Sequence, residues 1–392
     1  MGNAPPTVYR VISNSMLEII IDSIETSPNN CITFADYMDL VLYHPQKGYY
    51  SSAQIDIGSQ GDFFTSSSLG SDFGELLAEQ FKEMSAVLNS SDSFTLVEVG
   101  AGTGSLAADI LHYFKIQYPD FYQNIKYIIV EESQGLIAEQ KHKLQEFEIV
   151  TWKSWQDITD NSIVGCIFSN ELIDAFPVHQ IVVEDQTVKE IYLTWENNQI
   201  KEIIDNISSP RLLEYFQLVD IDLTRDDYPG NYRTEVNLKA LDWLQVVTNK
   251  IKKGYLLTID YGYSASKYYH PQRYQGTLNC YYQHRHHHNP YVNLGEQDIT
   301  THVNFTALEK QGNLLGLETV GLTQQGLFLM ALGLGDRLSE LSNGNYTLPE
   351  ILKRRDALHQ LINPTGLGGF KVLIQGKEID KNKPLKGLRE NI

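Results

Sequence analysis

Apolar residues in the middle of the chain alternate between two periods, one typical of strands and one typical of helices. After Phe94, apolar residues recur at 106, 110 and 114, which is the spacing of one face of a helix. Segments rich in apolar residues predict strands at 94–99, 127–130, 163–168 and 255–260. The segment at 127–130 is continuously apolar, which is expected of a strand buried on both faces of a sheet. This alternation predicts an α/β fold built on a mostly parallel, doubly wound sheet.

The patterns also divide the chain into a core and added segments. The four expected parts are an N-terminal helical and loop block that covers the site at 1–90, a core at 91–262 with a hairpin insertion at 178–231, a Tyr- and His-rich insertion at 263–300, and a C-terminal part of the core at 301–392 with a helical arm at 327–362. Two closing strands are expected at 317–322 and 370–374, the last of them antiparallel. A helix at 232–253 is expected to end at Gly254.

The glycines after the first core strand indicate the class of ligand. An acid stands at 98 and glycines at 100, 102 and 104, whereas a dinucleotide-binding fingerprint requires its third glycine where this chain has Ser105. Glycine lets a ligand approach the backbone closely because it has no Cβ. The acid-first pattern is typical of Rossmann-like methyltransferases that bind S-adenosylmethionine (SAM), whose cationic end suits a carboxylate. The expected cofactor contacts here are Glu98, Gly100, Ala101, Gly102 and Gly104.

Two glutamates follow the strand expected at 127–130. An acid at this strand end can accept hydrogen bonds from both hydroxyls of a ribose, although either glutamate could equally be a solvated charge. Their position one helix after the glycine turn favours the ribose contact. We expect Glu131, which directly follows the strand, to make it and Glu132 to matter less.

A third polar segment follows the strand expected at 163–168. It contains Asn170, Glu171 and Asp174 and is stopped by Pro177. In a doubly wound sheet, the ligand-binding and active site lies beyond the carboxyl ends of the strands. We therefore expect Asn170 to contact the cofactor and the two acids to act in catalysis; the alternative is that they only cap the turn. The segment lacks the Asn-Pro-Pro-Tyr signature of enzymes that methylate the amino groups of bases or glutamine.

Short segments along the chain resemble, in order, the MidA-type family of mitochondrial complex I assembly-factor methyltransferases and their bacterial relatives. Its most specific blocks contain Gly-Asp-Phe, Asn-Glu-Leu and Gln-Asp-Ile-Thr. The segments lie at 34–38, 44–50, 61–66, 73–77, 97–104, 130–133, 170–177, 259–262, 295–305 and 323–326. The resemblance implies a SAM-dependent methyltransferase that acts on an exposed arginine of a protein substrate.

A guanidinium substrate would need carboxylates that localise its charge and leave one terminal nitrogen able to attack. Glu171 and Asp174 are the first candidates, and Asp62 in the Gly-Asp-Phe loop is the next. Two departures from the family pattern fall on the substrate side: Ser67-Ser68 replaces a segment with a carboxylate, and Asn279 replaces a usual arginine. The alternatives are a non-catalytic SAM-binding assembly protein and a small-molecule methyltransferase with the 263–300 insertion as its lid.

The amino-acid composition restricts the kinds of partner and the location that we expect for this protein. A formal net charge of −18 argues against a nucleic-acid surface. The three scattered cysteines favour a reducing compartment, and the chain has neither an apolar run long enough to span a membrane nor a signal-peptide start. These features predict a cytoplasmic location. The histidines at 284 and 286–288 are adjacent in a loop without accompanying cysteines, so we expect no metal there.

Overall fold

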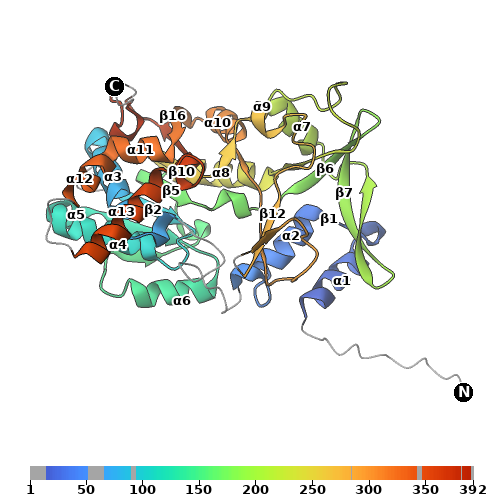
Figure 1. Ribbon diagram of the computed structural model, residues 1–392, viewed down its shortest axis with the longest axis horizontal. Coiled ribbons are helices and arrows are strands. Elements are labelled where there is room, and N and C mark those ends of the chain that lie inside the picture. The colour runs from blue at the N-terminus through green and yellow to red at the C-terminus, as the bar shows by residue number, and fades with distance from the viewer. Residues whose placement is uncertain are drawn as a thin grey trace, which may run out of the picture.

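A seven-stranded sheet lies at the centre of the computed structural model, which describes residues 15–51, 66–89, 94–283, 285–341, 347–380 and 382–389 (Figure 1). The strand order is β16-β17-β10-β5-β2-β3-β4. The strands are β2 (Thr95–Val99), β3 (Lys126–Val130), β4 (Val150–Trp152), β5 (Ile163–Asn170), β10 (Ile251–Asp260), β16 (Glu318–Gln324) and β17 (Lys371–Lys377). The run from β10 to β4 is parallel, and β17 is antiparallel to both of its neighbours. The α/β fold with an antiparallel last strand is therefore confirmed.

Helices cover both faces of this sheet because successive residues of each buried strand point to opposite sides. Leu96 packs in one apolar cluster and its neighbour Val97 in the other. The first cluster contains residues of α3 (Asp72–Leu88), α4 (Ser105–Gln117), α5 (Pro119–Asn124), α11 (Gln325–Leu332), α12 (Leu334–Glu340) and α13 (Leu348–Ile362). Leu144 of this cluster directly follows α6 (Gln134–Lys143). The second contains residues of α8 (Leu238–Lys250) and α10 (Phe305–Leu314).

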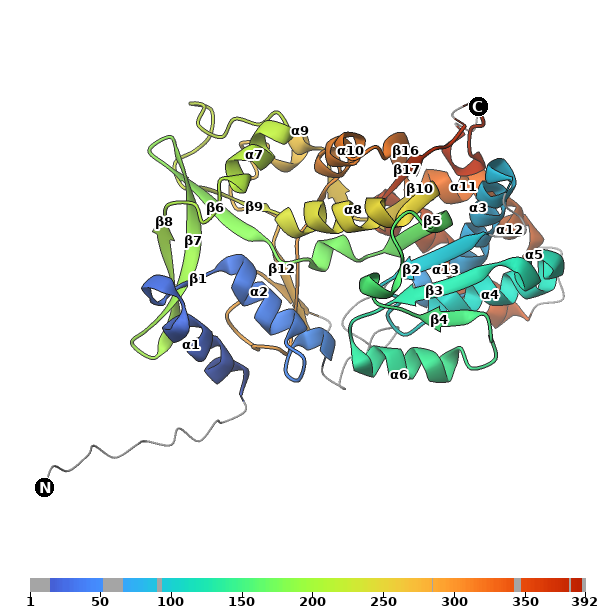
Figure 2. The same cartoon turned by 180° about the vertical axis from the view of Figure 1, so that it is seen from behind.

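A second, antiparallel sheet lies at the other end of the molecule, beside the N-terminal helices (Figures 1 and 2). Its strands are β1 (Ile32–Thr33), β6 (His179–Glu184), β7 (Thr187–Glu196), β8 (Gln199–Asp205) and β9 (Tyr232–Val236). Around it lie α1 (Met16–Thr26), α2 (Phe34–Tyr43), α7 (Arg211–Leu218) and α9 (Ala265–Tyr268). The 263–300 insertion adds a three-stranded sheet of β12 (Asn279–Tyr282), β13 (Arg285–His287) and β14 (Asp298–Thr300), and β11 (Gly262–Tyr263) pairs with β15 (Val303–Asn304).

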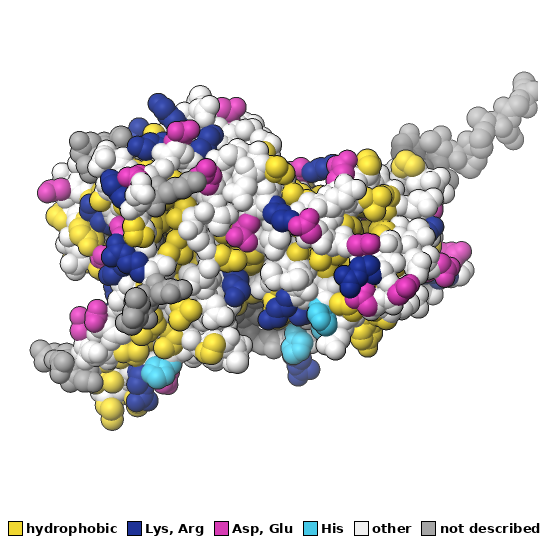
Figure 3. Space-filling model, turned by 90° about the horizontal axis from the view of Figure 1, so that it is seen from above, with side chains coloured by type: hydrophobic (Ala, Val, Ile, Leu, Met, Phe, Trp, Pro, Cys, Tyr) yellow, Lys and Arg dark blue, Asp and Glu magenta, His cyan; other side chains and the backbone are white. Residues whose placement is uncertain are grey.

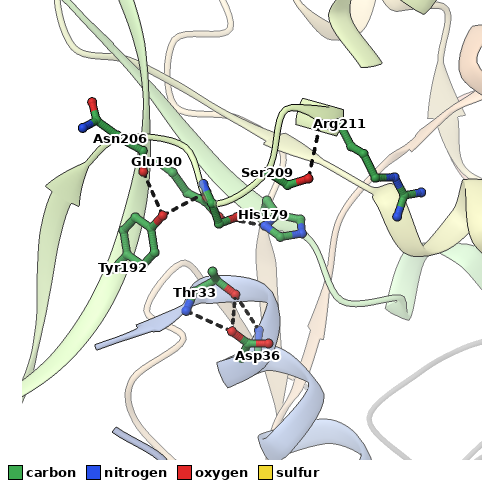
Figure 4. A network of polar contacts seen from close by, with 9 residues as sticks. Thr33, Asp36, His179, Glu190, Tyr192, Asn206, Ser209 and Arg211 are labelled. Atoms are coloured by element: carbon green, nitrogen blue, oxygen red, sulfur yellow. Dashed lines mark hydrogen bonds and ion pairs between the residues drawn. The ribbon is translucent and has the colours of Figure 1, made fainter. Parts of the chain in front are cut away.

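A buried glutamate ties this second sheet together (Figure 4). The Glu190 side chain is completely buried, and one of its carboxylate oxygens lies 2.7 Å from Nδ1 of His179 on the neighbouring strand. The Tyr192 hydroxyl donates to the Asn206 carbonyl at 2.8 Å. Such contacts offset the cost of burying a charge. His179 follows Pro177 by two residues, so its contact with Glu190 also fixes the segment that leads away from β5.

The structure corrects the helix that the sequence predicted at 232–253. That segment is strand β9, helix α8 and the start of β10, and the Asn237 side chain caps α8 by accepting from the Ala240 amide at 2.8 Å. Gly254 is not a helix cap but lies inside β10 with φ +143°, where an added Cβ would come within 2.0 Å of the Gly165 carbonyl oxygen. The alternating pattern was wrongly read because a short strand and a helix follow each other without a Gly or Pro between them.

Two other boundaries also differ from expectation. Strand β5 extends two residues beyond Phe168, so Asn170 is its last residue. In the described part of the chain, no helix has the length and apolar character needed to cross a membrane. Among the described side chains on the face shown in Figure 3, Lys and Arg are interspersed with Asp and Glu and form no continuous basic patch.

Candidate active site

A cavity of about 1260 Å³ opens at the carboxyl ends of β2, β3 and β5. The glycine turn after β2 forms one part of its wall, and the segment after β5 forms another. Residues of the N-terminal block also line it, among them Tyr43 and Tyr50. The cavity therefore lies at the edge where a doubly wound sheet places its ligands.

The turn between β2 and α4 has the backbone that its glycines allow. Gly100, Gly102 and Gly104 have φ of +68°, +52° and +79°, a region that other residues rarely adopt. The Gly100 amide donates to the Val130 carbonyl at 3.0 Å, which ties the turn to β3. Gly100, Ala101 and Gly102 line the cavity as expected. Gly104 does not appear in the wall; it precedes α4, and an added Cβ would contact Gln140 of α6 at 3.4 Å.

Glu98 lies on β2 just before this turn and lines the cavity while being almost fully buried. Burial raises the pKa of its carboxyl to about 7, although the Tyr127 hydroxyl, which donates to it at 2.6 Å, acts in the opposite direction. A cationic ligand group placed beside it would favour the ionised form.

Glu131 lies at the end of β3, on the wall of the same cavity. Its Oε1 accepts from the amides of Glu132 and Ser133 at 2.9 and 3.0 Å, which fixes the orientation of the carboxylate. Burial raises the pKa of Glu131, while these backbone hydrogen bonds lower it. The carboxylate is thus held at the strand end that the sequence predicted, whereas the Glu132 side chain is exposed.

Gln140 on α6 is a residue that the sequence reasoning missed. It is fully buried, and its Nε2 donates to the Gly102 carbonyl at 2.8 Å and to Glu131 Oε2 at 3.3 Å. Its Oε1 accepts from the indole of Trp152 at 2.9 Å. One amide therefore connects the glycine turn with the acid at the end of β3. A buried glutamine on a helix gives no periodic signal that would have revealed this.

The segment after β5 places two acids on the opposite part of the wall. Glu171 has φ +50°, and its Oε1 accepts from the Ser66 amide and from the side-chain amide of Asn170, both at 3.3 Å. Burial, and then the neighbouring Asp174, raise the pKa of Glu171 to about 8. Asp174 accepts from the Tyr261 hydroxyl at 2.6 Å, and burial raises its pKa to about 6.

Two buried acceptor atoms in this part of the wall have no hydrogen-bond partner in the described structure. They are Oδ1 of Asp174, whose side chain is 5 % exposed, and Oδ1 of Asn170. An unpartnered buried acceptor is costly. Both residues line the cavity, so a ligand that donates hydrogen bonds there would satisfy them.

Two more residues of this region had no assigned role from the sequence. Asp260, the last residue of β10, accepts from the amides of Ile173 and Asp174. Asp298 of β14 lines the cavity, and both of its carboxylate oxygens lie 2.9 Å from the Tyr50 hydroxyl. They stand in the segments 259–262 and 295–305, so the family resemblance pointed to them without indicating any chemistry.

The structure thus brings most of the expected site residues to one cavity, those in its wall being Glu98, Gly100, Ala101, Gly102, Glu131, Asn170, Glu171 and Asp174. Asp62 lies outside the described residues. Of the departures from the family pattern, Ser67 and Ser68 line the cavity, and Asn279 on β12 donates to the Thr277 carbonyl.

The sheet order, the glycine turn and the acid at the end of β3 define a Rossmann-like, SAM-dependent methyltransferase. The chain belongs to the family described as "Putative S-adenosyl-L-methionine-dependent methyltransferase", whose model matches residues 76–323.

Relatives with known names agree with this class. The chain is 28 % identical over 364 residues to the human protein arginine methyltransferase NDUFAF7, mitochondrial, covering 86 % of this chain and 78 % of that one. The homologue from Drosophila melanogaster is 27 % identical over 380 residues, covering 87 % and 80 %.

Solved structures extend the likeness over nearly the whole chain. A likely methyltransferase of the COG1565 superfamily from Burkholderia thailandensis, bound to S-adenosyl-homocysteine, has a TM-score of 0.80 at 28 % identity and covers 95 % of each chain. A second structure of this superfamily from the same organism has a TM-score of 0.81 at 30 % identity, covering 95 % of this chain and 94 % of that one. The cofactor of this chain is therefore SAM.

The residues of the cavity fit this cofactor. The positive-φ turn leaves backbone exposed to a ligand, Glu131 offers an oriented carboxylate, and Asn170 offers a free acceptor. No lysine or arginine is needed for this cofactor, since SAM carries no phosphate.

Proposed function

We propose that this enzyme methylates the arginine side chain of a protein. The observation that carries the proposal is Oδ1 of Asp174, an acceptor without a partner among the described residues, buried in a cavity wall that also contains a second acid, Glu171. A guanidinium is permanently charged and carries five N–H donors in a plane, which suits two adjacent carboxyl groups. The relatives named as protein arginine methyltransferases support the same substrate class.

SAM supplies a methyl group on a cationic sulfur, which a nitrogen nucleophile can displace. We assign Glu131 to the ribose of the cofactor and the glycine turn, with Glu98, to its methionine end. Asn170, the last residue of β5, lines the same cavity and donates to Glu171, so we assign its side chain to contacts with both ligands. These residues bind and orient, which is most of what an in-line displacement requires.

Glu171 and Asp174 have the substrate role. Their carboxylates would hold the guanidinium by two of its nitrogens and leave the third directed at the methyl group. Methylated arginine remains a monocation, so one N–H proton must leave during the reaction. Asp174 Oδ1 has no hydrogen-bond partner in the described part of the chain, and we assign it as the acceptor of this proton. A bound guanidinium would stabilise both acids in their ionised form, against the effect of burial.

A labelling experiment tests this proposal. The purified enzyme is incubated with methyl-labelled SAM and a cell extract, and the labelled protein is hydrolysed to amino acids. We expect the label in methylarginine, and we expect a synthetic peptide around the labelled site to lose it when the arginine is replaced by lysine or by citrulline, its neutral isostere. Label only in small molecules, or SAM binding without any turnover, would refute the proposal and favour a small-molecule methyltransferase or an assembly protein, respectively.

A further inference from the structure

Asp260 is the most completely buried acid at the end of the central strands, with an exposed fraction of 0 %. Its Oδ2 accepts from the amides of Ile173 and Asp174 at 3.0 and 3.2 Å, and its Oδ1 accepts from the Tyr261 amide at 2.8 Å. The first two amides belong to the short 3₁₀ turn Ile173–Ala175 that presents Asp174 to the cavity. Asp260 itself does not line the cavity.

The position of the Asp260 carboxyl group is energetically unfavourable for its ionised form. Burial, and then the acids Asp174 and Glu171, raise the pKa of Asp260 well above its ordinary value. A buried acid surrounded by acids destabilises the fold unless its hydrogen bonds compensate. The three backbone bonds provide that compensation, and two of them act on the one turn that carries a site acid.

We propose that Asp260 is a positioning residue of the methyl-transfer site, holding the turn at 173–175 so that the carboxylate of Asp174 faces the substrate. This inference rests on the proposed function only for the role of Asp174. Tyr261 is the next residue in the chain, and its hydroxyl donates directly to the carboxylate of Asp174.

Asp260 is also coupled electrostatically to the two site acids, whose charges raise its pKa because like charges disfavour ionisation. The other titratable groups around this cluster come from the N-terminal block, β12, β14 and the segment after β14, and they are Tyr43, Tyr50, Tyr281, Asp298 and His302. Replacing Asp260 by a neutral residue therefore removes this coupling from the cluster of acids.

Asp260→Asn tests the proposal because an amide has one acceptor and one donor end and cannot accept on both sides. We expect its SAM affinity to stay within about threefold of the wild type and its kcat for arginine methylation to fall about tenfold to a hundredfold, as when a group that orients a reacting ligand is lost. The acidic limb of its pH–rate profile should also change, because the coupling of Asp260 to the two site acids is lost, which a merely structural defect would not cause. Asp222→Asn, an exposed acid remote from the cavity, is the matched control and should match the wild type in all three.

Two further measurements keep the outcomes distinct. If Asp260→Asn does not fold, Asp260→Glu keeps the charge but displaces the acceptors by one methylene, and it should also show low kcat with near-normal SAM affinity. Wild-type kcat in either folded variant would overturn the proposal, as would an unchanged pH profile in Asp260→Asn. If the wild type methylates no arginine, the proposed function fails by itself. The Asp174 carboxyl titration, followed by NMR of ¹³C-labelled enzyme, then still tests Asp260: a changed titration in Asp260→Asn supports its hold on the turn that carries Asp174, and an unchanged titration contradicts it.

Discussion

At the scale of single residues, the account depends on carboxylates whose surroundings give them different tasks. Glu131 accepts two backbone hydrogen bonds at a strand end, whereas Glu171 and Asp174 lie deeper, beside each other. The former is oriented for hydroxyl donors, and the latter pair is suited to a cation. The same residue type therefore serves the cofactor at one part of the wall and the substrate at another.

Glu131→Gln should weaken SAM binding because an amide keeps only one acceptor for the ribose hydroxyls. We expect a loss of about 1.5–3 kcal/mol, the range for hydrogen bonds to charged groups, measured by isothermal titration calorimetry. The exposed neighbour provides the control, since Glu132→Gln should change the affinity little. If the two variants rank in the opposite order, the ribose ligand has been placed one residue too early.

At the scale of elements, the strand-to-helix turn at 100–104 is the part that admits the cofactor. Its positive φ values are a property of the turn as a whole, and Gln140 of α6 holds it from behind. The sequence predicted this element because glycines at this spacing allow the positive φ values that the turn requires. It could not show Gln140, because a contact between a helix and a turn about forty residues away in sequence leaves no local pattern.

Gly102→Val should abolish SAM binding while the protein stays folded, because a branched residue is strained at φ +52° and its side chain would extend from the cavity wall. Gly316→Val is the matched control. Gly316 also has positive φ, at +86°, but lies at the end of α10 with open space around it. Calorimetry should show normal SAM affinity in the control; near-normal affinity in Gly102→Val would contradict the assignment of the turn. Neither the wild type nor the control should bind NAD at micromolar concentrations.

At the scale of the whole molecule, the central sheet was predictable and the second sheet only in part. Buried strands and regular helices can be recognised from the spacing of their apolar residues, so β2, β3, β5 and α4 fall where expected. The strand β9 was missed because its partner β6 is about fifty residues away in sequence, and local periodicity does not record such a pairing. The hydrogen bonds between Asp260 and the loop after β5 likewise join residues that are distant in sequence, so local periodicity does not predict them.

The buried acids should make the stability of the free enzyme depend on pH. The folded-state pKa values of Glu98, Asp174 and Glu171 are raised to about 7, 6 and 8. The folded state thus binds more protons than the unfolded state over this interval, so the free energy of unfolding should fall as pH rises from about 5 to about 8.

Urea denaturation at a series of pH values measures this dependence. Glu171→Gln should reduce the fall above pH 6, and the exposed Glu132→Gln should leave it unchanged. A wild-type stability that stays level or rises over the same interval would show that folding does not raise the pKa values of these acids.

The central claim is that the acids after β5 serve the substrate and not the cofactor. The most direct measurement compares SAM affinity and arginine methyl transfer in Glu171→Gln and Asp174→Asn. We predict affinities within about threefold of the wild type, less than 1 kcal/mol, together with transfer rates lower by on the order of a hundredfold or more, as when one transition-state contact is lost. A collapse of SAM affinity along with activity, or undiminished transfer in both variants, would contradict the account.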